Sequence, residues 1–446
     1  MSSVAVTTIV VIAAIILFMI LCIKGMGSIP AAFICVALVS IVADGGLVSN
    51  LTGTFITGMT ANFATFFFLF SMGCAFGGLL SACGAADRLG RTFVKLLGQE
   101  NCVYVILIVS ILLGLCGVAP CALVPFLAYG MLRASNLPRY IGMVAVASGT
   151  TISYTLVPGT LAPPNVLAAT ILGEASNGAT SIYAAPLYSI CLLVFTIVLN
   201  CLYIHWLIKR ARAKGLGYEA GETAAMRAEM RPESEMPSFL SSIVALAIPI
   251  VFSMVTILIF HWDTIPAALL GLTLGMLFLI VVNHSYFKGG IFNSIRTNVE
   301  GIQWNIISAL AVCGFASVIA NTSVYGAVIG KLTASNINPY VLTVIGALIL
   351  GGLCADFIAG SATFAGTIGT HILQSSARVN VQVMQRLALT STSVFDSLPH
   401  GGMVLLALSM FGYNHKDAYK YLVGSNIIVP LCTTIFGLIL SLTVFG

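Results

Sequence analysis

Long apolar runs separated by short polar loops make up most of the 446-residue chain. One crossing of a bilayer by a helix needs about 20 predominantly apolar residues. Runs of that length predict ten crossings, five on each side of the long polar segment 209–238. The crossings are expected at about 4–23, 29–48, 54–85, 140–172, 182–208, 239–260, 265–286, 301–330, 380–412 and 420–445.

Two other apolar stretches are interrupted near their centres by small residues. The stretch 103–133 breaks between Gly117 and Pro120, and the stretch 338–376 breaks around Gly360. Neither half of either stretch is long enough to cross a membrane comfortably. We therefore predict two re-entrant hairpins, each of which enters and leaves the membrane on one face.

The two halves of the chain share one order of elements: three spans, a hairpin, a broken span and a last span. Cys116 in the first hairpin corresponds to Cys354 in the second, and Pro158 in the first broken span corresponds to Pro399. An odd number of crossings per half would invert the second copy, as in many secondary transporters. We predict an all-α polytopic membrane protein with two inverted repeats and helices broken at the membrane midplane. The expected parts are a first repeat 1–208 (scaffold spans 1–85, hairpin 103–133, broken span 140–172, span 182–208), a linker 209–238, and a second repeat 239–446 (scaffold spans 239–330, hairpin 338–376, broken span 380–412, span 420–445).

Charge supports the membrane assignment and orients the chain. Only 7% of the residues are charged, against about 25% in soluble domains, which excludes a soluble enzyme. Cytoplasmic loops are enriched in Lys and Arg, and all 19 such residues except Lys331, Arg378 and Arg386 fall on the linker side. We expect a solvated cytoplasmic linker and both termini outside.

The sequence predicts a lipid surrounding and no nucleic-acid, metal or cofactor site. The lipid bilayer is the expected surrounding, and no basic cluster interleaved with aromatic residues indicates a nucleic-acid surface. The 12 cysteines are scattered through apolar runs without metal-ligand spacing, so they are expected to be packing residues and no metal or cofactor is predicted. The sequence contains no GxxxxGK[ST], HExxH or GxSxG motif, which argues against ATP coupling and catalysis.

Most charges lie at the ends of spans, and the main exceptions lie at helix breaks inside the membrane, where ionisable groups are costly and often functional. Asp356 lies at the second hairpin tip, and Asp396 and His400 flank Pro399 in the second broken span. Asp356 and Asp396 are predicted to couple transport to H⁺ or Na⁺, a choice that the sequence leaves open. The alternatives are that Asp396 caps backbone freed by Pro399 and that His400 is a hydrogen-bonded packing residue.

Hydroxyl groups and glycines gather at the same breaks and are candidates for binding a substrate carboxylate, with help from half-helix N-termini. Single Ser and Thr residues in membrane helices often bond only to their own backbone, but clustering at matched breaks favours a site. The predicted substrate-binding residues are Thr151, Ser153, Thr155, Gly159, Thr160, Asn165, Gly360, Ser361, Thr363, Ser393, Ser397, His400 and Gly401.

At these segments the sequence resembles the gluconate permease (GntP) family of bacterial carboxylate symporters, within the ion transporter superfamily. The most specific match is Asp396-Ser397-Leu398-Pro399-His400-Gly401-Gly402 followed by His415-Lys416-Asp417-Ala418-Tyr419. Pro158-Gly159-Thr160 with Asn165, and Gly117 to Pro120 leading to Arg133-Ala134-Ser135-Asn136-Leu137-Pro138, are similar to other family segments. Pro163-Pro164 and Gly402 depart from the usual polar context.

The resemblance implies proton-driven uptake of gluconate, 3-hydroxybutyrate or a related small carboxylate across the bacterial inner membrane. It also implies a homodimer formed through the scaffold spans, which suits a mobile unit that needs an anchored frame. A passive anion channel is the main alternative, and an intramembrane enzyme is a third. Polar residues gathered near mid-membrane favour an occluded site over a continuous pore.

Overall fold

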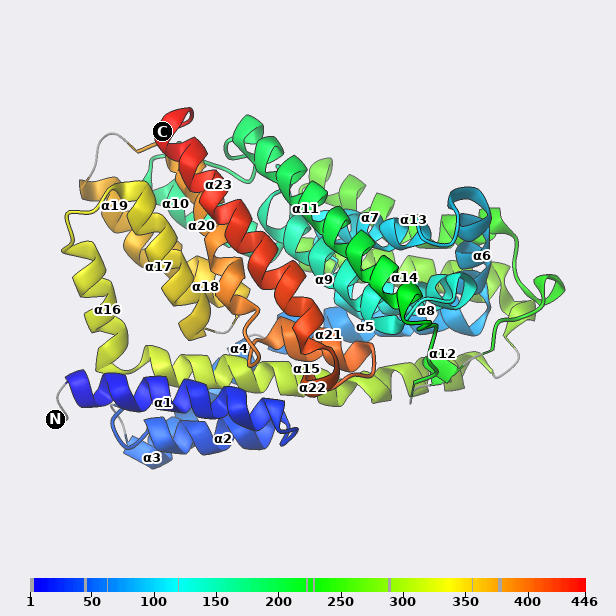
Figure 1. The fold of residues 1–446 in the computed structure, drawn as a ribbon, viewed down its shortest axis with the longest axis horizontal. Coiled ribbons are helices and arrows are strands. Elements are labelled where there is room, and N and C mark those ends of the chain that lie inside the picture. Colours follow the sequence, from blue (N-terminus) through cyan, green and yellow to red (C-terminus); the bar gives the residue numbers. More distant parts are fainter. Residues whose placement is uncertain are drawn as a thin grey trace.

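The computed structural model describes residues 4–446 except 44–45, 62, 119, 222–223, 228, 288–289, 355 and 376–378. Arg378, which the charge count places outside, lies beyond the described residues. All regular secondary structure in the described part of the chain is helical, as expected from its apolar runs (Figure 1). In Figure 1 both termini lie toward one end of the molecule, while the short linker helix α12 (Ala224–Arg227) lies toward the other.

Five helices of the described chain are long and apolar enough to cross a membrane alone, and α5 with α6, bent by 70°, form a sixth candidate. The other predicted crossings consist of shorter or broken helices, so ten crossings remain a prediction. The single-helix spans are α1 (Val4–Ile23), α11 (Pro186–Ala213), α13 (Phe239–Leu258), α14 (Thr264–Val282) and the continuous run of α22 (His415–Leu422), η5 (Val423–Ile428) and α23 (Val429–Thr443).

In the segments predicted to form the scaffold, the longest helix is α15 (Ile291–Ala320), which packs against α2, α4, α5 and α21. α15 begins before the predicted span 301–330, and a break at Asn321 and Thr322 separates it from α16. Other helices in and next to the segments predicted to form the scaffold are α2 (Ser28–Val39), α3 (Gly46–Ser49), η1 (Asn50–Thr54), α4 (Phe55–Ala61), α5 (Phe63–Ala82), α6 (Ala85–Leu97) and α16 (Ser323–Thr333).

Helix pairs occupy both predicted hairpins, and helix breaks occupy both predicted broken spans. The first set is α7 (Cys102–Leu115), α8 (Pro120–Ser135), α9 (Arg139–Thr155) and α10 (Pro163–Ala175). The second set is α17 (Pro339–Cys354), α18 (Phe357–Phe364), η4 (Ala365–Gly369), α19 (Thr370–Ser375), α20 (Val381–Asp396) and α21 (Gly402–Met410). Pro158 and Pro399 each lie in the break, where a missing N–H ends the helical ladder.

Corresponding helices in the two sets pack alike. α7 lies against α9 as α17 lies against α20, and α8 contacts α21 as α18 contacts α10. Glycine permits both close approaches: a Cβ at Gly149 would overlap Ser110 of α7, and a Cβ at Gly351 would overlap the Thr392 carbonyl of α20. Small residues at such contacts let membrane helices pack by dispersion and shape where no hydrophobic drive exists.

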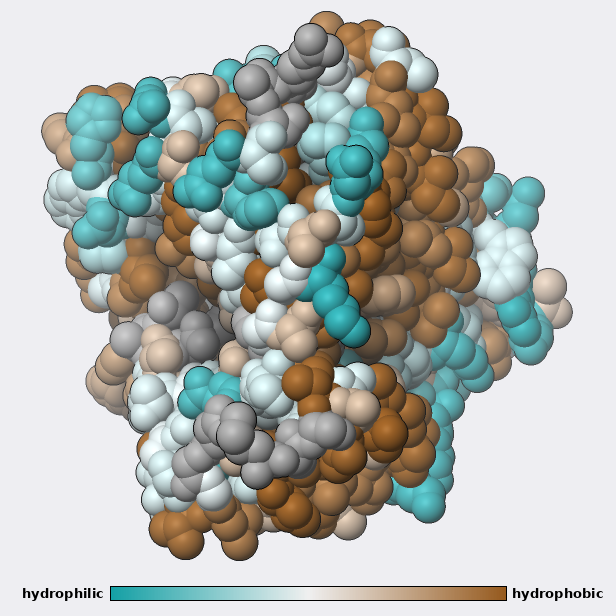
Figure 2. Space-filling model, turned by 90° about the vertical axis from the view of Figure 1, so that its left-hand side faces the viewer, coloured by the Kyte–Doolittle hydropathy of each residue, from teal (hydrophilic) through white to brown (hydrophobic). Residues whose placement is uncertain are grey.

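The surface separates apolar flanks from polar ends. Figure 2 shows hydrophilic residues gathered on the end that bears α16 and α19, with hydrophobic residues along the flanks. On the described flanks, large apolar side chains such as Ile9, Val194 and Leu277 are exposed. Exposed apolar flanks are expected where a protein faces lipid.

The linker is held against the protein, which differs from the solvated segment expected from its charge. Arg88 donates to the Pro237 carbonyl at 2.8 Å, and Arg91 donates to the Arg231 carbonyl at 2.7 Å. Lys95 donates to Glu233 at 2.9 Å, and this hydrogen bond lowers the pKa of the Glu233 carboxyl. Guanidinium groups satisfy carbonyls of the irregular linker, so the charges bind backbone instead of only facing water.

We expect a large stability difference between a buried and an exposed ion pair. Arg133 and Asp87 are 2.7 Å apart with 7% and 5% side-chain exposure, whereas Arg296 and Glu300 are 68% and 60% exposed. Asp87→Ala leaves a buried cation unpaired, so unfolding should become easier by about 3–5 kcal/mol. Glu300→Ala, the matched control, should cost about 0–1 kcal/mol. Thermal unfolding in detergent measures both, and equal losses would contradict the burial of the first pair.

Candidate functional site

A cavity of about 90 Å³ lies where the two broken spans meet the second hairpin. A single water needs roughly 10–15 Å³ by the same kind of measure, so this cavity has room for a small solute. Its walls come from α5, α8, α9, α15, α18, α20 and α21. The lining residues are Phe70, Pro120, Cys121, Thr150, Thr151, Tyr154, Ile306, Cys313, Asp356, Phe357, Ile358, Ser393, Asp396, Gly402, Met403 and Leu406.

Two carboxyl groups converge on the N-terminus of α18. Asp356 caps this helix, and its Oδ1 accepts a hydrogen bond from the Ala359 N–H at 2.7 Å. Asp396 ends α20, and its carboxyl accepts from the Phe357 N–H. The first N–H groups of a helix lack intrahelical partners and carry partial positive charge. One helix end therefore holds both of the predicted ion-coupling residues at the cavity wall.

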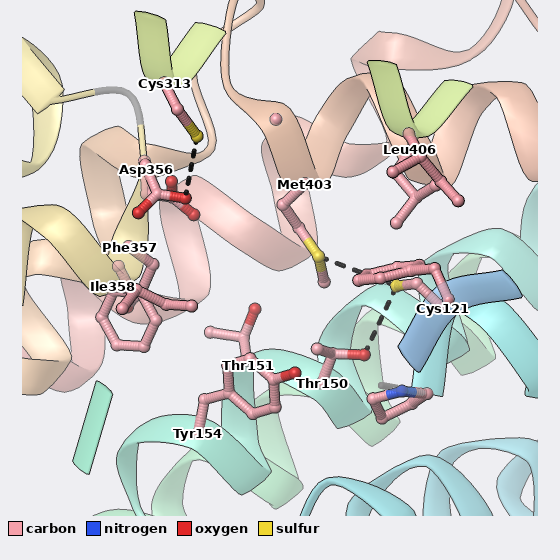
Figure 3. A pocket seen from close by; sticks show the side chains of 16 residues that line it. Cys121, Thr150, Thr151, Tyr154, Cys313, Asp356, Phe357, Ile358, Met403 and Leu406 are labelled. Atoms are coloured by element: carbon pink, nitrogen blue, oxygen red, sulfur yellow. Dashed lines mark hydrogen bonds between the residues drawn. The ribbon is translucent and has the colours of Figure 1, made fainter. Parts of the chain in front are cut away.

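A thiol from α15 completes this wall. Cys313 of α15 lies with its Sγ 3.8 Å from Asp356 Oδ2, and Figure 3 shows this contact at the edge of the cavity. Cys121 of α8 also lines the cavity and lies 3.5 Å from the Thr150 hydroxyl. These two cysteines were expected to be packing residues, and the structure places them at the site as well. Their positions depend on contacts between distant helices, so the scattered spacing gave no signal of them.

The opposite wall is a face of α9 that carries hydroxyl groups. Figure 3 shows Thr151 and Tyr154 across the open space from Asp356. The Thr151 hydroxyl accepts from Asn426 Nδ2 at 3.0 Å, and its own proton has no acceptor within the described chain. The Tyr154 hydroxyl likewise has no protein partner among the described residues. Both groups can therefore donate to a bound ligand. Their i, i+3 spacing, which puts them on one helix face, is the signal that would have added Tyr154.

The lining has acidic and neutral polar groups but no Lys, Arg or His among the described residues. His400 is buried beside the Gly352 carbonyl of the second hairpin and packs against Phe18, with ring centroids 5.9 Å apart. His400 thus lies against the second hairpin and outside the cavity lining.

Several predicted substrate-binding residues instead hold the break of the first span. Asn165 donates to the Thr160 carbonyl at 2.8 Å and accepts from Arg386 at 2.9 Å. Gly159 has φ 78° and lies under the Tyr183 ring, a position where a side chain would clash. Thr160 is fully buried, and its hydroxyl faces the Ala162 N–H at 3.4 Å. Gly159 and Thr160 thus lie in the loop between α9 and α10, Asn165 lies in the first turn of α10, and all three lie outside the cavity lining.

The remaining predicted residues divide between backbone bonds and a second cavity. A cavity of about 10 Å³, the size of one water, is lined by Thr155 together with Thr151 and Ser393 of the main cavity. The other residues lie outside the main lining. Three of them donate to backbone carbonyls: Ser153 to Thr150 at 2.8 Å, Ser397 to Ser393 at 3.4 Å and the Gly401 N–H to Leu398 at 2.8 Å. The last three lie on α18, where Gly360 packs on Thr392, Ser361 is buried without a hydroxyl partner among described residues, and Thr363 lies farther along the helix.

Comparison with known proteins decides the family. The model of the GntP family permeases matches residues 6–443 of the chain. The chain belongs to the GntP permease family. It is therefore a multi-pass membrane transporter and not an enzyme. The match to the family model confirms the family resemblance found in the motifs of the sequence.

Two curated relatives of this GntP-family chain are transporters by name. It is 22% identical over 450 residues to "Uncharacterized transporter YxjC" of Bacillus subtilis, an alignment that covers 92% of this chain and 94% of the relative. It is 25% identical over 229 residues to "Uncharacterized permease" of Haemophilus influenzae, with 49% of this chain and 45% of the relative covered.

Two solved transporter structures align over nearly the whole chain at low similarity. The YdaH transporter of Alcanivorax borkumensis gives a TM-score of 0.44 at 14% identity, covering 96% of this chain and 97% of its own. MtrF of Neisseria gonorrhoeae, described as illuminating a class of antimetabolite efflux pumps, gives 0.40 at 13% identity, covering 97% and 95%.

Proposed function

We propose that this permease is a secondary active transporter that carries a small organic anion, such as gluconate, 3-hydroxybutyrate or a related carboxylate, together with protons. The main observation is that Asp356 and Asp396 share one cavity whose described lining includes no basic side chain. Two ionised carboxylates would repel an anion in this low-dielectric site. Protonation removes that repulsion, so the anion and the proton enter the site together.

Protonation of the two acids also changes which hydrogen bonds they can make to the substrate. When Asp356 and Asp396 are neutral, they can donate hydrogen bonds to the substrate carboxylate, and the Thr151 and Tyr154 hydroxyls can donate from the opposite wall. When the two acids lose their protons, they become acceptors only and repel the anion. Release of protons toward the cytoplasm would thus weaken substrate binding at the same time.

The packing of the helices supports alternating access by two inverted repeats. The α8 to α21 contact and the α10 to α18 contact exchange under an operation that relates 1–208 to 239–446. Such an operation places the substrate site at the interface of the repeats, where the cavity lies. In this scheme the hairpins and broken spans form the mobile unit, and the helices around α15 form the scaffold.

The setting proposed for this mechanism is a bacterial inner membrane, with the linker 209–238 cytoplasmic and both termini outside. It is supported by the charge asymmetry of the loops and by the termini lying toward the end opposite α12 (Figure 1). A homodimer through the scaffold would anchor the moving unit. Cross-linking in native membranes that traps only monomer would argue against the dimer.

Uptake into proteoliposomes tests the function. With an acidic exterior, radiolabelled gluconate or 3-hydroxybutyrate should accumulate inside at least about tenfold over protein-free vesicles, because one pH unit stores about 1.4 kcal/mol per proton. Collapse of the gradient by a protonophore should abolish the accumulation. Uptake driven only by a Na⁺ gradient would replace the proton in this scheme by Na⁺ bound between the carboxylates. Flux without saturable counterflow would indicate the channel alternative.

A further inference from the structure

Much of the cavity wall is hydrocarbon. Six large apolar side chains contributed by α5, α15, α18 and α21 line the cavity: Phe70, Ile306, Phe357, Ile358, Met403 and Leu406. In Figure 3, Met403, Leu406 and Cys121 lie across the space from Asp356. The cavity thus has its two carboxyl groups on one side, beside Phe357 and Ile358. The side chains of Met403 and Leu406 of α21 form an apolar end on the other side.

The polar groups left free for a ligand are few. Thr150 already donates its hydroxyl proton to the Val146 carbonyl at 2.9 Å, and Ser393 donates to the Thr390 carbonyl at 2.7 Å. Among the described lining residues this leaves the Thr151 and Tyr154 hydroxyls and the two acids as side-chain donors of O–H hydrogen bonds. A carboxylate has two oxygens that accept several hydrogen bonds, so one carboxylate head group uses this set.

We propose that the site selects short monocarboxylates with a hydrocarbon tail over polyhydroxylated sugar acids. This inference rests on the proposed carboxylate transport and narrows its substrate class. A sugar acid carries a hydroxyl on nearly every carbon, and the apolar side chains that make up much of this wall offer no partners for them. A buried hydroxyl without a partner opposes binding, because it gives up its hydrogen bonds to water. A hydrocarbon tail loses no hydrogen bonds there, and each CH₂ group removed from water favours binding.

Met403 is the residue at which a substitution can test the preference for hydrocarbon-tailed acids over sugar acids. It is partly exposed to the cavity, and its thioether lies 3.7 Å from the Cys121 thiol. Met403→Gln keeps the length of the side chain and adds an amide with donors and an acceptor. The variant should bind a hydrocarbon-tailed acid less well and a sugar acid better. Met26→Gln, at a methionine that is 46% exposed and outside the cavity lining, is the matched control.

Binding is measured on the full-length protein in detergent at pH 5.5, from the thermal stabilisation produced by butanoate, pentanoate or gluconate. Permeant weak acids cross bilayers unaided, so binding is a cleaner measure than uptake for these probes. We expect butanoate and pentanoate to bind at least tenfold more tightly than gluconate, and Met403→Gln to shrink this ratio at least tenfold while Met26→Gln leaves it unchanged.

Equal or tighter binding of gluconate by the unsubstituted protein would overturn the inference, as would an unchanged ratio in Met403→Gln. Either result leaves the proposed function standing if proton-driven uptake of gluconate is observed in the proteoliposome assay. Absence of both binding and proton-driven uptake for every carboxylate tested would overturn the proposed function as well. The two failures are therefore distinguishable.

Discussion

Asp396→Asn is expected to abolish accumulation against a gradient while substrate exchange continues. The substitution keeps the size of the side chain and its acceptor oxygen, so the contact with the Phe357 N–H survives. It removes the group that would bind and release the coupling proton. A permanently neutral Asn also lacks the charge that would repel the anion, so the variant should still bind substrate.

The measurement compares two assays on the same proteoliposomes. Counterflow of preloaded substrate should stay within about tenfold of the unsubstituted rate, and the accumulation ratio under a pH gradient should fall to one, a loss of at least about 1.4 kcal/mol of coupled driving force for each pH unit. Asp263→Asn is the control, because Asp263 is exposed and lies outside the cavity. Full gradient-driven uptake by Asp396→Asn would reject the coupling role. A weakened Na⁺ dependence in its place would assign the residue to Na⁺.

A purely structural role for the acids predicts a different outcome. Asp356 bonds to the Ala359 N–H in the geometry of an N-cap. Loss of such a cap costs about 0.5–2 kcal/mol by analogy with soluble helices. Transport near the normal rate with only that loss of stability would leave Asp396 and Asp356 as capping groups.

Arg386→Ala is expected to have the largest effect on folding. Arg386 is fully buried, and no carboxylate pairs with it among the described residues. Its guanidinium donates to Asn165 Oδ1, to the Ala184 and Ile182 carbonyls and, at 3.4 Å, to the Thr155 carbonyl. Thr155 ends α9, where helix carbonyls lack partners and carry partial negative charge.

Removal of this side chain deletes four hydrogen bonds from a charged donor, and such bonds contribute about 1.5–3 kcal/mol each. The Asn165, Ala184 and Ile182 oxygens keep a second donor, whereas the Thr155 carbonyl is left without one among the described residues. The free energy of unfolding should fall by more than about 3 kcal/mol, and transport should fall with the yield of folded protein. Arg386→Lys keeps the charge but not the planar fork of donors, so it should recover part of the stability. Arg296→Ala, at an exposed arginine, is the control. Thermal unfolding of Arg386→Ala within about 0.5 kcal/mol of the unsubstituted protein would contradict the anchoring role.

The sequence by itself determined the helices, their breaks and the family. Length and apolarity decide whether a segment can span a bilayer, and proline removes a backbone donor wherever it occurs. The breaks at Pro158 and Pro399 were therefore predictable from local chemistry, as was the presence of an acid at the second hairpin tip and another at the second break. The motif from Asp396 to Gly402 indicated the GntP family, and the full-length family match confirmed it.

Only the tertiary structure decided which polar residues line the cavity. Asn165 was predicted to bind substrate, but it bonds to Arg386, which lies 221 positions away in the chain. Arg386 was counted as a loop charge, and Cys313 as a packing residue. The pattern of residues cannot show which side of a helix meets which neighbour when nearly every side is apolar. Contacts between distant helices make that choice, because each buried polar group must find a partner where water is absent.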